Sequence, residues 1–101
     1  MRTILLNDLS NPVDVEIRIP SLHQSYRYTH DEVSNYMLLE EFVHDVCSGL
    51  FEGVKFKMNR YHASGKSFVL SHTGVPSLRG MPLATVFIKI YDPCTGKEIV
   101  V

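Results

Sequence analysis

Residues 29–51 read THDEVSNYMLLEEFVHDVCSGLF, and this stretch decides the fold. Thr29 stands three residues before Glu32, the spacing at which a hydroxyl and a carboxylate each accept one of the free N–H groups of a first helical turn. Gly53 follows the last apolar pair of the stretch, and a glycine there ends a helix without a Cβ penalty. The stretch therefore predicts one long helix from about residue 30 to residue 51, with Thr29 as its cap.

This helix has one apolar stripe when its residues are placed at about 100° each. The stripe consists of Tyr36, Leu39, Val43, Val46, Cys47 and Leu50. We expect the stripe to pack on a sheet and the opposite, acidic face to lie in water. Leu38 and Phe42 project from the flank of the stripe, so they need another cover, either loops of the same chain or a second subunit. They are the candidate oligomer-interface residues.

Apolar and polar residues alternate with period two on both sides of the helix, which predicts strands. The alternating segments are 13–19, 54–61 and 83–91, and the shorter segments 3–6, 67–71 and 97–101 are also interpreted as strands. We interpret 3–6 and 13–19 as a hairpin and residues 21–28 as a connection to the helix. The order β-β-α-β-β-β-β predicts an α+β fold, an antiparallel sheet covered on one face by one long helix, in a single domain over residues 1–101. The pattern leaves the strand order open.

The composition indicates a small cytoplasmic protein. A chain of 101 residues with a hydrophobic fraction of 45% can bury one core. Its only cysteines are Cys47 and Cys94, fewer than a secreted scaffold of this size usually carries, so we expect free thiols. No signal peptide and no membrane-spanning run is expected. A net charge of −1 gives no global attraction to nucleic acid or to an anionic membrane.

No motif names a reaction, so we predict no catalytic residues, no metal ligands and no cofactor. Residues 65–67 (Gly-Lys-Ser) lack the first glycine of a phosphate-binding loop and precede a strand rather than a helix. His44 and Cys47 lie one helical turn apart, which is half of a metal site, but no second pair has ligand spacing. We expect Cys47 to be a neutral thiol in the core, where it is no nucleophile.

Two surfaces are candidate binding sites. If Ala84, Val86, Ile88 and Ile90 face the helix, the open face of the sheet carries Phe87, Lys89, Tyr91, Lys55 and Lys57. Aromatic rings interleaved with lysines suit an ordinary solvated sheet face, a protein contact or the stacking of single-stranded nucleic acid. The second surface combines Tyr26, Arg27 and Tyr28 with Arg79 in the long aperiodic segment 72–82, because Tyr and Arg are frequent in interface hot spots.

These patterns favour a small non-enzymatic protein-binding module, such as an adaptor, an inhibitor or an assembly factor of the kind found in bacteria or their viruses. The expected partner is another protein, and a homodimer is an open alternative. A single-stranded nucleic-acid binder that uses the open sheet face is the second hypothesis. The third is a small metal-dependent or histidine-based enzyme.

Overall fold

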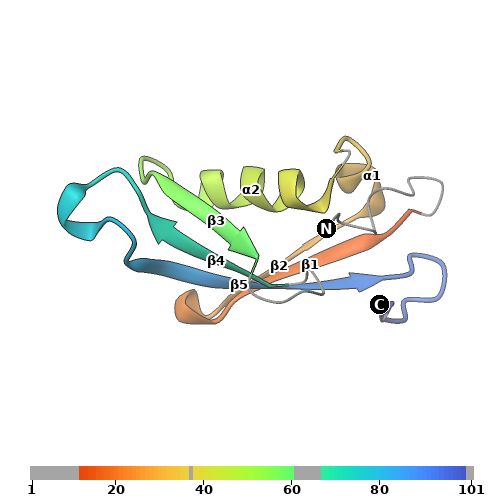
Figure 1. Cartoon of the computed structure of the whole chain (residues 1–101). Coiled ribbons are helices and arrows are strands. Elements are labelled where there is room, and N and C mark those ends of the chain that lie inside the picture. Colours follow the sequence, from red (N-terminus) through yellow and green to blue (C-terminus); the bar gives the residue numbers. More distant parts are fainter. Residues whose placement is uncertain (1–11, 37, 61–66, 100–101) are drawn as a thin grey trace.

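The computed structural model describes residues 12–36, 38–60 and 67–99 of the chain. Its strands are β1 (Asp14–Ile19), β2 (Gln24–Tyr28), β3 (Phe56–Arg60), β4 (Ser67–His72) and β5 (Pro82–Tyr91), and its helices are α1 (His30–Val33) and α2 (Leu39–Leu50). Two short 3-10 turns, η2 (Pro20–Leu22) and η3 (Pro76–Leu78), complete the set. The strands form one antiparallel sheet in the order β2-β1-β5-β4-β3. Both helices lie on one side of it (Figure 1). The predicted α+β class is confirmed.

Period-two alternation in β1 and β5 builds the centre of the core. In β5 the side chains of Ala84, Val86, Ile88 and Ile90 are buried, as predicted. Ile17 of β1 pairs with Ile88 of β5, so the apolar positions of the two strands face the same side of the sheet. Phe68 and Leu70 of β4 extend this surface, and α2 covers it with Leu39, Phe42, Val43 and Cys47.

The first hairpin is not the predicted one. We expected residues 13–19 to pair with residues 3–6, which lie outside the described residues. The structure pairs β1 with β2, for example Val15 with Tyr28 and Ile17 with Tyr26, so residues 24–28 are an edge strand and not a connection. Pro20 opens the 3-10 turn η2, and His23 closes it with φ 53° and an N–H that donates to the Pro20 carbonyl at 3.0 Å. This reversal returns the chain beside β1.

The predicted single helix is two helices. Thr29 begins α1 in an extended conformation, and its backbone N–H and hydroxyl both donate to Glu32 Oε1, at 3.1 and 3.2 Å. The helix then stops, because residues 34–35 form a turn in which the Ser34 hydroxyl donates to the Asp31 carbonyl at 2.9 Å. Leu38 is extended again and starts α2, with its N–H donated to Glu41 at 3.2 Å. The two helices thus have separate starts.

Two tyrosine rings, one from β2 and one from the connection between the helices, cover Phe42. Its side chain is only 3% exposed, because the rings of Tyr28 and Tyr36 contact it edge-on, with centroids 5.1 and 5.2 Å away. Phe42 is therefore a core residue that is unavailable for the oligomer interface proposed from the sequence. Leu38 remains 37% exposed at the start of α2. Of the predicted strand at 97–101, the described part pairs only as a bridge between Glu98 and Tyr91.

Candidate functional site

The open face of the sheet carries the predicted aromatic and basic residues of β5. Phe87, Lys89 and Tyr91 lie opposite the buried positions of that strand. Lys57 lies on edge strand β3, where it pairs with Ser71. Lys55 comes just before β3 and lies against the loop that follows β4, since its carbonyl accepts the Thr73 N–H at 3.1 Å. The structure thus brings together three of the five predicted residues and leaves the other two lysines near the β3 edge.

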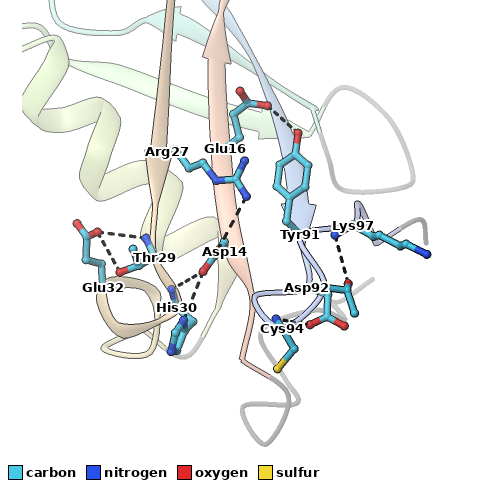
Figure 2. Close-up of polar contacts among 11 residues, drawn as sticks. Asp14, Glu16, Arg27, Thr29, His30, Glu32, Tyr91, Asp92, Cys94 and Lys97 are labelled. Carbon is cyan, nitrogen blue, oxygen red and sulfur yellow. Dashed lines mark hydrogen bonds and ion pairs between the residues drawn. The ribbon is translucent and has the colours of Figure 1, made fainter.

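Tyr91 is already engaged within the chain. Its hydroxyl donates to Glu16 Oε1 at 3.0 Å, and the guanidinium carbon of Arg27 lies 4.2 Å from the centre of its ring. Figure 2 shows these side chains together on β2, β1 and β5. A ring whose face is covered by an arginine and whose hydroxyl is bonded is a poor stacking platform for a base.

Glu16 and Asp14 organise the polar contacts around Tyr91. Glu16 also accepts the Ser25 hydroxyl at 2.9 Å and lies 3.2 Å from Arg18 Nε. Asp14 Oδ1 accepts the backbone N–H of His30 at 2.8 Å, and its second oxygen lies 4.0 Å from Arg27 (Figure 2). We call these residues the polar network: Asp14, Glu16, Arg18, Ser25, Arg27, His30 and Tyr91. The network joins β1 to β2, β5 and the start of α1.

The network changes the acidity of its members. Burial raises the pKa of Glu16, but hydrogen bonds from Ser25 and Tyr91 and the charge of Arg18 outweigh burial, so the pKa of Glu16 lies below its ordinary value of 4.5. Burial and the hydrogen bond to Glu16 raise the pKa of Tyr91. At neutral pH Glu16 is therefore ionised and the Tyr91 hydroxyl is protonated.

Phe87 is the remaining exposed ring of the predicted face. It borders a shallow hollow whose other lining residues are Pro20, Ser21, Val69, Pro82 and Thr85. No charged side chain lines this hollow, which we call the Phe87 hollow. Arg18 pairs with Phe87 across β1 and β5, and Lys89 is two residues further along the same face. The basic side chains therefore lie beside the exposed ring.

The second predicted surface does not exist as a unit. Tyr26, Arg27 and Tyr28 lie in strand β2 rather than in a loop, and Tyr28 packs on the core. Arg27 contacts Tyr91 at the end of β5, whereas Arg79 lies in the loop before the start of that strand. The 10 residues of β5 separate these positions by roughly 30 Å. Arg79 therefore belongs to a different region.

That region contains a surface that the sequence reasoning missed. At the end of the sheet where β5 begins, a hollow of about 340 Å³ is lined by Gly53, Val54, Lys55, His72, Gly74, Val75 and Leu78. Val54, Val75 and Leu78 are 37%, 50% and 36% exposed, and Met81, bonded to Leu78 through its backbone, is 51% exposed. We call this site the loop-end hollow. The sequence marked the segment 72–82 as long and aperiodic, but its apolar residues carried no period that pointed to a surface.

Backbone hydrogen bonds hold the loop of this hollow in place. The N–H of Leu78 donates to Val75 at 2.9 Å, that of Met81 to Leu78 at 2.9 Å, and that of Gly80 to His72 at 2.8 Å. The N–H of His72 in turn donates to Met81 at 2.9 Å. The loop is therefore a defined structure that presents its apolar side chains outward.

Cys47 lies in the core, as the sequence predicted. Burial raises the pKa of its thiol to about 11. His44 is exposed, 5.2 Å from the Phe56 ring and next to Ser48. Among the described residues no three His, Cys, Asp or Glu side chains gather as metal ligands would.

Comparisons with protein-family models, with curated protein sequences and with solved structures found no match for this chain. Within residues 12–36, 38–60 and 67–99, no helix is long and apolar enough to cross a lipid bilayer.

Proposed function

We propose that this protein is a small non-enzymatic protein-binding module whose main docking surface is the loop-end hollow. One observation carries the proposal. Of the seven exposed large apolar side chains among the described residues, four, namely Val54, Val75, Leu78 and Met81, belong to this hollow and its edge. Clusters of exposed apolar side chains mark sites of protein contact, whereas single ones are normal on any surface. The proposal includes a cytoplasmic location, since both cysteines are free thiols.

The chain supplies a matched control for this surface. The turns η2 and η3 have the same sequence, Pro-Ser-Leu, and both end on an exposed leucine, Leu22 at 40% and Leu78 at 36%. Leu78 lines the loop-end hollow, whereas Leu22 lines neither this hollow nor the Phe87 hollow. Replacing each leucine with aspartate therefore makes the same chemical change inside and outside the proposed site.

The test compares wild type, Leu78→Asp and Leu22→Asp as baits in cells of the source organism. Proteins captured by wild type and lost with Leu78→Asp are then purified and titrated directly. We expect Leu78→Asp to weaken binding by at least ~2 kcal/mol, about 30-fold, and Leu22→Asp to leave it unchanged. Thermal unfolding of all three proteins checks that they fold equally well. A purified partner that binds Leu78→Asp as tightly as wild type refutes the loop-end hollow as the docking surface.

Single-stranded nucleic acid is a second candidate partner, favoured by the exposed ring of Phe87 beside Arg18 and Lys89 on the open sheet face. Titration of a fluorescent oligonucleotide at two salt concentrations tests it, because phosphate contacts make affinity fall steeply with salt. Binding by this face requires weaker binding by Phe87→Ala and Lys89→Ala. The absence of binding at low salt would eliminate this candidate.

A further inference from the structure

The loop-end hollow combines apolar walls with basic groups and has no acidic lining residue. Val54, Val75 and Leu78 supply the apolar surface, and Lys55 and His72 are the only lining residues with charged or titratable side chains. Arg79 follows Leu78 and Glu52 precedes Gly53; both are exposed, and neither lines the hollow. Within the described part of the chain, Lys55, His72 and Arg79 make no ion pair. The positive charges of Lys55 and Arg79 and the hydrogen-bond donors of all three side chains are therefore available to a partner.

Lys55 lines the hollow next to Gly74, whose lack of a side chain leaves room for the Lys55 stem. A Cβ added to Gly74 would lie 2.9 Å from Cβ of Lys55, 3.2 Å from its Cδ and 3.3 Å from its Cγ. The aliphatic part of Lys55 therefore packs directly on Gly74, in space that only glycine leaves free. The ammonium group is thus carried by a stem that contacts Gly74.

Two other hollows among the described residues differ from it in charge. The Phe87 hollow has no charged lining residue. The groove between α2 and β3 is lined by Glu40 and Glu41 as well as by Lys57, His44, Phe56 and Met58. The loop-end hollow is thus the one of the three that joins apolar walls to a basic lining without acidic residues.

We propose that the loop-end hollow binds an acidic segment of a partner protein, and this inference rests on the docking function proposed above. An apolar side chain of the segment packs between Val54, Val75 and Leu78. Asp or Glu side chains on either side of it meet the Lys55 ammonium, the His72 ring N–H and the Arg79 guanidinium, because charge-assisted hydrogen bonds to carboxylates are stronger than neutral ones. The apolar contact supplies affinity, and the basic groups select acidic sequences over basic ones.

The probe is a library of random peptides displayed on phage, selected on wild-type protein and counter-selected on Leu78→Asp. We expect the surviving sequences to have an apolar residue flanked by Asp or Glu. The most enriched sequence is then synthesised, together with a copy in which Asn and Gln replace Asp and Glu. The neutral copy should bind wild type about 5- to 10-fold more weakly than the acidic one, the size of one or two exposed ion pairs.

Three variants locate the interaction on the protein. Lys55→Met keeps the aliphatic stem and removes the charge, so we expect it to weaken the acidic peptide about 5-fold and to leave the neutral copy unchanged. Gly74→Ala, which displaces the Lys55 stem, should have an effect in the same direction. Lys57→Met is the matched control, two residues away and in a different groove, and should bind like wild type. Thermal unfolding checks the fold of each variant.

The acidic-segment inference is overturned if the selected peptides carry no acidic residues, if counter-selection leaves no peptide, or if Lys55→Met binds both peptides like wild type. Concentration-dependent dimerisation that Leu78→Asp abolishes would also overturn it, because the hollow would then hold a second copy of the chain. In each of these cases the docking function still stands or falls on the direct titration of the purified partner with Leu78→Asp and Leu22→Asp.

Discussion

The two ends of strand β5 differ in how their side chains are used. At its last residue, Tyr91 is bonded to Glu16 and covered by Arg27, so aromatic and charged groups that resemble a binding platform contact each other. At its first residues, the loop-end hollow leaves Val75, Leu78 and Met81 exposed although each lies in a hydrogen-bonded loop. Residue type alone therefore does not identify a binding surface, because neighbouring side chains decide whether a group is still available.

The largest expected effect is the difference in unfolding free energy between removing a buried apolar side chain and removing an exposed one. Phe42→Ala should lower the free energy of unfolding by about 3–5 kcal/mol, because it removes a ring packed between Tyr28 and Tyr36 and leaves a cavity. Leu78→Ala should lower it by less than about 0.5 kcal/mol, as surface substitutions do. Urea denaturation measures both. Similar losses for the two variants would show that the loop-end leucine serves stability rather than binding.

A smaller effect is expected in the polar network. Glu16→Gln should cost about 1–2 kcal/mol at neutral pH, because Ser25, Arg18 and Tyr91 lose a charged acceptor. The pKa of Glu16 is lower in the folded state than its ordinary value of 4.5, so its contribution is fully present above that value and is lost as the pH falls through the folded pKa. The stability difference between wild type and Glu16→Gln should therefore shrink in acid. A difference that stays constant from neutral pH to pH ~3 would contradict the network.

The smallest expected effect concerns the backbone of the loop-end hollow. Gly80 has φ 82° and open space where a Cβ would be, so Gly80→Ala should cost about 1 kcal/mol from backbone strain alone. Gly49→Ala is the control, since Gly49 lies inside α2 with equally open space and alanine favours a helix. Thermal unfolding should move in opposite directions for the two variants. A shift of both in the same direction would remove the argument that the loop is held in this conformation.

The sequence predicted the elements in which one periodicity governs a whole segment. Alternation from Ala84 to Ile90 assigned the two faces of β5 correctly, and the buried Cys47 followed from the helical stripe. The α+β class followed from the order of these elements. Such patterns are reliable because burial on one face acts on every second or every third to fourth residue.

The misses occurred where local chemistry overrides periodicity. Strand β2 is an edge strand with exposed and half-buried residues only, so it has no apolar alternation to detect. The break after Val33 depends on the Ser34 side chain bonding its own turn, a weak signal inside a strong apolar pattern. The β3–β4 hairpin, which the sequence did predict, brings Val54 near Val75 and Leu78, but no period in the segment after β4 indicated that these side chains share a surface.

The strand order has a consequence for how the chain folds. β5, the last described strand, is the central one, and it joins the β1–β2 hairpin to the β3–β4 hairpin. Ile17 pairs with Ile88, and the two residues are far apart in the sequence. This contact therefore forms more slowly than the contacts within the local hairpins. During synthesis the residues of both hairpins are made before β5, and without β5 each hairpin has two unpaired outer edges and an apolar face that β5 does not yet extend. The sheet is completed only when β5 enters between β1 and β4, so the newly made chain is most prone to aggregation just before that step.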